Sequence, residues 1–259
     1  MAKRRNAKAE HRPEPRSEKL DLVKFPRTRH LLDAGGNGVS RDDLLMTAKE
    51  AIAFLKGKVV SVEEKVDGAN LGFSVNKNNE IRAQNRSHFV ISNSHQQFST
   101  LEAWISRHSA SLLRVLEHGK FILYGEWAYA KHSIFYTRLP SYFVAFDIYD
   151  TDNGHFVSRK TRDKMLNGTG IATVPLIVEK EFRSPGELLP YLEAPSAYYD
   201  GPVEGIYLRV DEDTQDNHKA ENSGTLLQRA KIVRPDFLQQ IEEQWTRQKF
   251  VKNICEVYY

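Results

Sequence analysis

The chain has 259 residues, 40% of them hydrophobic and 27% charged, with a formal net charge of +3, values typical of a globular protein with one large or two small domains. Its single cysteine, Cys255, excludes an internal disulfide framework and a cysteine-rich zinc site. No apolar run approaches the roughly 20 residues that span a bilayer, and no apolar stretch follows the basic N-terminus as in a secretory signal, so we expect an intracellular protein, cytoplasmic or nuclear.

The basic excess is concentrated at the N-terminus. Residues 1–16 hold six cations against two acids, so the rest of the chain carries a charge of −1. With Pro13 and Pro15 and little apolar content, this composition predicts a disordered tail over residues 1–24, ahead of a folded domain over residues 25–259. The tail could bind RNA or DNA through phosphates, act as a nuclear address, or be a solvated terminus without a specific role.

Hydrophobic periodicity and turn signals predict the elements of the folded part. Ser40 and Asp43 fit the N-cap and acidic third position of the first helix, and Ser184 opens a capping box. In chain order we expect a helix over 41–56, strands over 59–65, 70–75 and 81–85, a helix over 100–117, strands over 120–127 and 142–149, a short helix after Ser184, strands over 203–210 and 226–233, and a closing helix over 236–248. This order predicts an α+β fold of mainly antiparallel strands with flanking helices.

Two common enzyme classes lack their motifs. The glycine-rich run at 35–38 is not followed by the lysine and hydroxyl residue of a phosphate-binding loop. No pair of histidines has the spacing of a zinc protease. The sequence therefore argues against a P-loop kinase and a zinc enzyme.

The segment Lys65-Val66-Asp67-Gly68-Ala69-Asn70 lies between two predicted strands. Asp-Gly between β-type runs is a strong hairpin signal, and a lysine there often serves only solubility. A lysine held over a sheet could instead attack a nucleotide phosphorus. That chemistry needs the neutral amine, so we expect burial or a neighbouring cation to lower the pKa of Lys65.

Five further residues on or beside predicted strands could serve a lysine nucleophile. Arg86 could clamp a phosphate through two parallel N–H bonds, Glu126 could bind a ribose hydroxyl or Mg²⁺, and the ring of Phe146 could stack on a purine. Glu204 adds a second carboxylate and Lys231 a second amine. Each alone is better explained by a core or surface role, and it is their joint occurrence that favours a nucleotide site.

In these residues the chain resembles the covalent nucleotidyltransferase superfamily of ligases and mRNA capping enzymes. Within it the chain is most similar to the ATP-dependent RNA ligases, especially the nick-sealing phage type. The matching motifs, in order, are the nucleophile motif at Lys65–Asn70 with Glu64 before it, Arg86, Gly125-Glu126, Phe146-Asp147, Glu204-Gly205-Ile206, and Lys231 as the first of two lysines. The second lysine falls on Val233, where Arg229 or Arg234 could supply its charge.

The resemblance covers residues 59–237 and implies a ligase-type nucleotidyltransferase (adenylation) domain. Only 22 residues follow Phe237, too few for the OB-fold appended to DNA ligases and capping enzymes or for the helical C-terminal domain of the phage type. The segment Phe25–Lys56, or an accessory protein partner, could compensate. We otherwise expect a monomer.

The resemblance also implies a function. Lys65 would form a lysyl-AMP intermediate with ATP and Mg²⁺ or Mn²⁺, pass AMP to a 5′-phosphate RNA end, and allow a 3′-hydroxyl to attack that end. Lys231 would assist catalysis, and the metal would be held by Glu126 and Glu204. The nucleotide-binding residues implied are Glu64, Asn70, Arg86, Glu126, Phe146, Glu204 and Lys231.

Three alternatives stay open on the sequence. A capping-type guanylyltransferase would use GTP, and a DNA ligase would seal all-DNA nicks. A non-catalytic RNA-binding relative, which Val233 makes conceivable, would bind nucleic acid without forming an adenylate.

Overall fold

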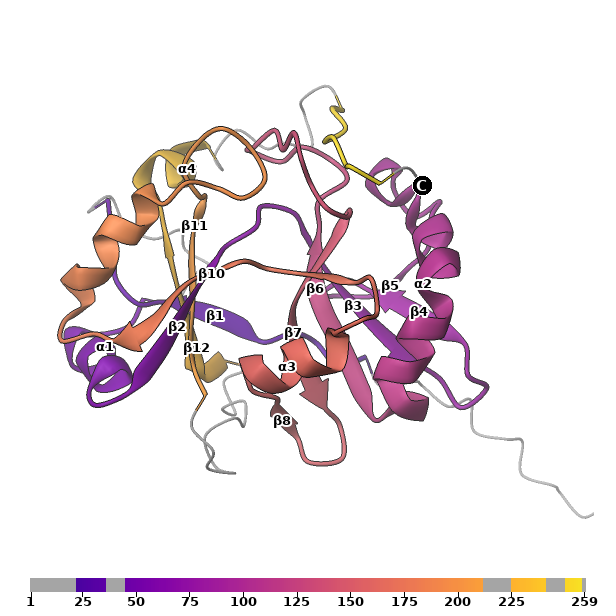
Figure 1. The fold of residues 1–259 in the computed structure, drawn as a ribbon, viewed down its shortest axis with the longest axis horizontal. Coiled ribbons are helices and arrows are strands. Elements are labelled where there is room, and N and C mark those ends of the chain that lie inside the picture. Colours follow the sequence, from indigo (N-terminus) through magenta and orange to yellow (C-terminus); the bar gives the residue numbers. More distant parts are fainter. Residues whose placement is uncertain (1–21, 36–44, 212–224, 241–249, 258–259) are drawn as a thin grey trace, which may run out of the picture.

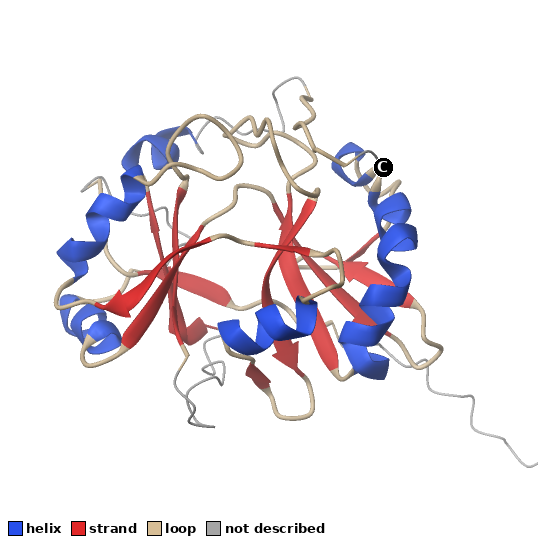
Figure 2. Cartoon of the chain, in the orientation of Figure 1, coloured by secondary structure: helices blue, strands red, loops and turns tan. Residues whose placement is uncertain are grey.

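A computed structural model describes residues 22–35, 45–211, 225–240 and 250–257. Two twisted sheets stand side by side with helices on their outer faces (Figures 1 and 2). The expected α+β class with mainly antiparallel strands is confirmed. The basic segment 1–16 lies outside the described residues, whereas the carbonyl of Val23 already accepts hydrogen bonds from Gln84 and Tyr124.

The first sheet has five strands in the order β1-β12-β11-β2-β10. Their bounds are β1 Arg27–His30, β12 Thr225–Val233, β11 Gly205–Val210, β2 Val59–Glu64 and β10 Leu176–Glu181. All pairings are antiparallel except β1 with β12, which is parallel. The N-terminal strand thus lies beside one of the last strands of the chain.

The second sheet has seven strands in the order β5-β4-β3-β6-β7-β8, with β9 also paired to β7. Their bounds are β5 Phe89–Val90, β4 Ile81–Gln84, β3 Ala69–Val75, β6 Phe121–Trp127, β7 Phe143–Asp150, β8 His155–Phe156 and β9 Ala172–Thr173. The register of β6 against β7 shifts between Tyr124 and Gly125 and leaves Phe146 without a partner on β6. Phe146 is therefore the extra residue of a β-bulge.

Helices flank the two sheets, and α3 lies where the sheets meet. Figure 1 shows α2 along the seven-stranded sheet and α1 beside the five-stranded sheet. The α-helices are α1 Ala48–Leu55, α2 Leu101–Leu116, α3 Arg159–Leu166 and α4 Pro235–Gln240, and the 3-10 helices are Gln96–Phe98, Glu117–Gly119 and Pro185–Glu193. Among the described residues, no helix is both long and apolar enough to cross a membrane.

Two helix predictions need correction, and a third is described only in part. The first helix starts at Ala48, not at residue 41, because Thr47 and Glu50 form a reciprocal capping box there; the expected caps Ser40 and Asp43 lie outside the described residues. The segment after Ser184 is a 3-10 helix, and the Ser184 side chain makes no capping bond. Of the closing helix, the structure describes only Pro235–Gln240.

Several elements escaped prediction for identifiable reasons. Strands β5, β8 and β9 have two residues each, too few to show an alternating pattern. Strand β10 is an edge strand rich in charge, as edges often are. Helix α3 buries only Arg162 and Leu166 out of eight residues, so it lacks an apolar stripe.

A buried network of charges joins the two sheets. Arg209 of β11 pairs with Asp147 of β7 and lies 3.5 Å from a carboxylate oxygen of Glu63 on β2. Arg162 of α3 donates to Glu63 and to the backbone carbonyl of Phe146, both at 2.7 Å. Arg229 of β12 contacts Asp147 from the other side at 3.4 Å. Because a buried charge is tolerated only when it is paired, these contacts fix the sheets relative to each other.

Arg209→Ala should destabilise the fold strongly. It leaves Asp147 and Glu63 buried with fewer counter-charges, a loss of about 3–5 kcal/mol in the free energy of unfolding, measurable by urea denaturation. Lys120→Ala is the control, because Lys120 and Glu117 form a solvent-exposed pair expected to be worth at most about 1 kcal/mol. Equal losses in the two variants would show that the buried network has no special weight.

Candidate active site

Lys65 lies in the segment that carries the chain from one sheet to the other. Strand β2 before it pairs only with β10 and β11, and β3 after it pairs only with β4 and β6. The Asp67-Gly68 turn is therefore not a hairpin, and that interpretation is wrong. Gly68 is needed for a different reason: a Cβ there would meet the backbone oxygen of Trp127 at 2.9 Å.

The Lys65 amine is held by carboxylates. Its Nζ atom lies 2.6 Å from both oxygens of Glu204. Burial by itself would lower the pKa of Lys65, but Glu204, followed by Glu126 and Asp67, outweighs it, and the pKa is raised. The expectation of a lowered pKa is thus wrong for this arrangement, because the neighbours are anions and not cations.

Two acidic residues beside Lys65, Glu204 and Glu126, have raised pKa values. Burial raises the pKa of Glu204, although Lys65 opposes the shift. Burial raises the pKa of Glu126 to about 8, against the pull of Lys65 and Arg86. The Oε2 atom of Glu126 is shielded from solvent and has no hydrogen-bond partner among the described residues. A buried oxygen without a partner at the edge of a cavity is suited to a ligand hydroxyl or a cation.

Aromatic rings form one wall of the site. The bulge in β7 turns the ring of Phe146 into the cavity, while Asp147 next to it receives the hydroxyl of Tyr207 at 3.1 Å. The rings of Phe25 and Phe146 meet edge to face, with centroids 4.9 Å apart. Phe25, Phe146 and Tyr207 all line the cavity, which makes this end apolar and flat-sided, as a purine requires.

Of the basic residues considered for the last motif, only Lys231 lines the cavity. Arg229 is buried below it and pairs with Asp147 and Asp211. Arg234 pairs with Asp236 outside the cavity. Val233 is buried. Neither arginine therefore brings its charge to the position of the second lysine.

Asn70 on β3 and Arg86 in the turn after β4 also line the cavity. Glu64 also lines the cavity, but its carboxylate is engaged by the Ser196 hydroxyl at 2.5 Å and the Ala197 amide at 3.0 Å. Burial raises the pKa of Glu64 despite these bonds. Its oxygens hold the loop at 196–197, so a direct nucleotide contact would require them to give up those partners.

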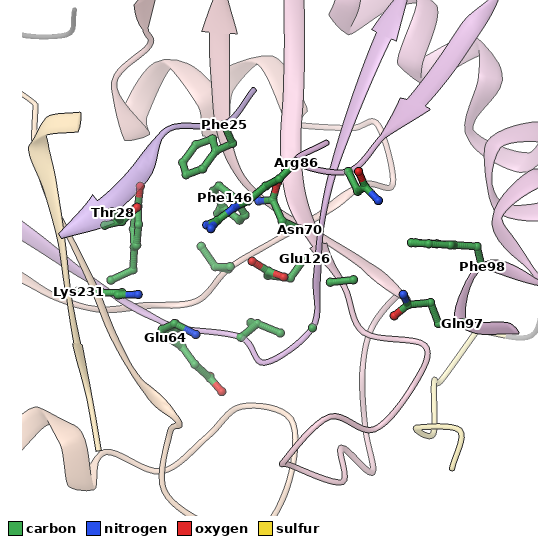
Figure 3. Close-up of a pocket in the computed structure, with 17 residues that line it drawn as sticks. Phe25, Thr28, Glu64, Asn70, Arg86, Gln97, Phe98, Glu126, Phe146 and Lys231 are labelled. Atoms are coloured by element: carbon green, nitrogen blue, oxygen red, sulfur yellow. The ribbon is translucent and has the colours of Figure 1, made fainter. Parts of the chain in front are cut away.

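The residues gather in a cavity of about 450 Å³ between the sheets, a size common for small-ligand sites. Figure 3 shows Asn70, Arg86 and Glu126 near its middle, Thr28 and Lys231 on one side, and Gln97 and Phe98 on the other. All the predicted residues line it except Glu204, which reaches it through Lys65. The lining residues that sequence reasoning missed are Phe25, Thr28, Val66, Gly68, Ala69, Asn85, Gln97, Phe98, Val174 and Tyr207.

Glu126 and Glu204 are acidic side chains at the site that could contribute to holding a divalent cation. The described residues contain no group of three or more His, Cys, Asp or Glu side chains able to hold a metal ion. The free oxygen of Glu126 and the carboxylate of Glu204 are hard oxygen donors of the kind Mg²⁺ takes from proteins, with phosphate and water as its other ligands. These two side chains thus fit a role as part of a cation site.

Comparison with known proteins gives a family and a fold. A family model described as RNA ligase matches residues 58–233. No curated protein matches the chain. An alanine variant of the Naegleria gruberi RNA ligase solved with ATP and manganese matches with a TM-score of 0.57 at 14% identity over 86% of this chain and 59% of that one. The same ligase with pyrophosphate gives a TM-score of 0.55 at 18% identity over 89% and 64%.

These likenesses cover less of the other protein than of this one. The chain spans 59% and 64% of the length of those two ligase chains. At these identities the match shows the shared fold.

The raised pKa of Glu126 predicts a pH effect on stability. Between its ordinary value of 4.5 and about 8, the folded protein holds a proton that the unfolded chain releases, so this residue lowers stability as pH rises through that window. Glu126→Gln cannot ionise. Its melting temperature should match that of the wild type near pH 4.5 and exceed it increasingly up to pH 8.

The control for this measurement is Glu117→Gln, at an exposed carboxylate, whose melting temperature should follow the wild type over the whole range. A constant difference between Glu126→Gln and the wild type from pH 5 to pH 8.5 would contradict the assignment.

Proposed function

Because this chain belongs to the RNA ligase family, we propose that it is an ATP-dependent RNA ligase that forms lysyl-AMP at Lys65. The observation that carries the proposal is the Lys65 amine at a cavity between two sheets, held by Glu204 and flanked by the ring of Phe146 and the amine of Lys231. A nucleophile, a flat apolar wall and a second cation are the parts that attack on a bound nucleotide requires.

The first step would be adenylation. The neutral Lys65 Nζ attacks the α-phosphorus of ATP, a nitrogen–phosphorus bond forms, the bond to the bridging oxygen breaks, and pyrophosphate leaves. The amine must first lose a proton. Glu204, with both oxygens 2.6 Å from Nζ and a raised pKa, is placed to accept it. Contact of Lys231 with the phosphates would offset their charge.

The next two steps would join RNA ends. The 5′-phosphate oxygen of one RNA end attacks the phosphorus of lysyl-AMP, and the Lys65 amine departs. A 3′-hydroxyl then attacks the activated 5′-phosphate and releases AMP, so that one phosphodiester forms for each ATP consumed. Arg86, which lines the cavity, would bind a phosphate through its guanidinium group.

Base and metal would occupy different parts of the cavity. Phe146 would stack on adenine, with Phe25 and Tyr207 closing the apolar end. Glu126 and Glu204 would hold Mg²⁺ or Mn²⁺, which when bound supplies positive charge near the phosphates. Asn70 and Glu126 would orient the ribose and phosphates from β3 and β6.

Lys65→Ala should abolish covalent labelling by α-labelled ATP with Mg²⁺ or Mn²⁺, because nothing else supplies the nucleophile. Lys56→Ala, at an exposed lysine outside the cavity, should label as the wild type does. Label retained on Lys65→Ala would contradict the proposal. Label from GTP in preference to ATP would indicate a guanylyltransferase, and efficient sealing of all-DNA nicks a DNA ligase. RNA binding without label would indicate a non-catalytic relative.

Phe146→Ala should weaken ATP binding roughly 5- to 150-fold, the equivalent of the 1–3 kcal/mol that one base–aromatic stack contributes. Equilibrium binding of ATP to the Lys65→Ala background measures this without turnover. Phe89→Ala removes an exposed ring outside the cavity and should leave ATP affinity unchanged. Equal affinities for Phe146→Ala and its parent would remove the stacking role.

A further inference from the structure

The Lys65–Gly68 turn is held from behind by a loop that does not line the cavity. The Asp67 amide donates to the Tyr136 hydroxyl at 2.8 Å. The Asp67 carboxylate accepts from the amides of Ser133 and Ile134 at 2.6 and 3.0 Å. On its other flank, the Lys65 amide donates to the carbonyl of Gly205 at 3.0 Å. The backbone that carries the nucleophile is thus fixed from both sides.

The C-terminal segment 250–257 fixes that loop in turn. In Figure 1 this segment, in yellow, lies beside the loop that follows β6. Five backbone hydrogen bonds of 2.8–3.1 Å join the two, namely Lys131 to Val251, Asn253 to Tyr129, Ile254 to Tyr136, Leu139 to Ile254 and Glu256 to Leu139, donor first. The segment therefore pairs with the loop over most of its length.

Asn253 is the centre of this pairing. Its side chain is buried, with 1% of its surface exposed. The Oδ1 atom accepts from the Tyr136 amide at 2.9 Å, and Nδ2 donates to the carbonyls of Ala128 and Ala130 at 2.9 and 3.2 Å. One acceptor and two donors are used at once, and among residues of this size only asparagine offers that combination.

Packing alone does not account for the Tyr136 hydroxyl. The ring is fully buried and contacts those of Tyr198 and Tyr199 at centroid distances of 6.0 and 5.9 Å. A phenylalanine ring would fill the same space without the cost of burying a hydroxyl. What the hydroxyl adds is its bond to the Asp67 amide, two residues from the nucleophile.

We propose that Tyr136 and Asn253 are positioning residues for Lys65. Through them the C-terminal segment 250–257 orients the Lys65 amine for attack. This inference rests on the proposed adenylation at Lys65. An amine attacking phosphorus must lie in line with the leaving pyrophosphate, and a displacement of about 1 Å can cost on the order of 100-fold in rate. The bond chain Asn253–Tyr136–Asp67 restrains that displacement without touching substrate.

The test is Tyr136→Phe in the full chain. Single-turnover labelling with α-labelled ATP should show a rate at saturating ATP that is 10- to 100-fold lower, with the half-saturating ATP concentration within about twofold of wild type. A misoriented Lys65 amine lowers the labelling rate and leaves ATP binding intact, whereas general damage to the cavity would alter both the rate and the binding. Tyr198→Phe, a buried neighbour whose hydroxyl is directed at the carbonyl of Thr173, should keep the wild-type rate.

Asn253→Asp provides an independent arm. It keeps the size of the side chain and replaces the two donors by acceptors that face carbonyls. Its labelling rate should fall similarly, and Tyr136→Phe with Asn253→Asp should be slowed by less than the product of the single effects, because both act through one chain of bonds.

A measurement without turnover separates this inference from the proposed function. In Tyr136→Phe, amide hydrogen exchange at Asp67 should speed up relative to wild type and to Tyr198→Phe, since the amide loses its acceptor. A wild-type chain that takes no label overturns the proposed function. The exchange result still tests whether the Tyr136 hydroxyl holds the Asp67 amide. Unchanged exchange at Asp67, or equal labelling rates for Tyr136→Phe and Tyr198→Phe in an active protein, overturns the positioning role.

Discussion

The buried pair of Arg209 and Asp147 joins the five-stranded sheet to the seven-stranded sheet, and the cavity depends on that junction. Lys65, Glu204 and Lys231 come from one sheet or its edge, and Glu126 and Phe146 come from the other. Neither sheet alone forms a site. Because Arg162 and Arg209 also bond the carbonyl of Phe146, the same network that joins the sheets sets the ring that would face a nucleotide base.

The positive charges at the site are balanced by nearby carboxylates, so the site is not simply basic. Lys65 lies among Glu204, Glu126 and Asp67, so its charge is stabilised, while burial raises the pKa of Glu204 and of Glu126. The cluster therefore carries little net charge. A bound nucleotide triphosphate and its cation would add several charges to it. The charge brought by a bound nucleotide and its cation would therefore act on Lys65, Glu204 and Glu126 together, because interacting groups titrate as a set.

The sequence predicted the chemistry of the site better than its geometry. Lys65, Glu126, Phe146 and Lys231 are recognisable because each lies in a short motif on a strand or directly after one. Phe25 and Thr28 carry no such signal, since they reach the cavity through a strand that pairs with residues about 200 positions away. The bulge that turns Phe146 inward and the passage of the chain between sheets at Asp67-Gly68 are tertiary features, and local turn propensity predicted a hairpin there.

The parallel pairing of β1 with β12 also has a consequence for biogenesis. Arg27 pairs with Thr225 and His30 with Lys231. At about 5–20 residues per second, a ribosome needs roughly 10–40 s to make the intervening 200 or so residues. Throughout that time Phe25 and Thr28 cannot take their final places. Once β11 has been made, the edge that pairs with β12 stays open until β12 follows. The nascent chain can thus complete the cavity only after β12 has been synthesised.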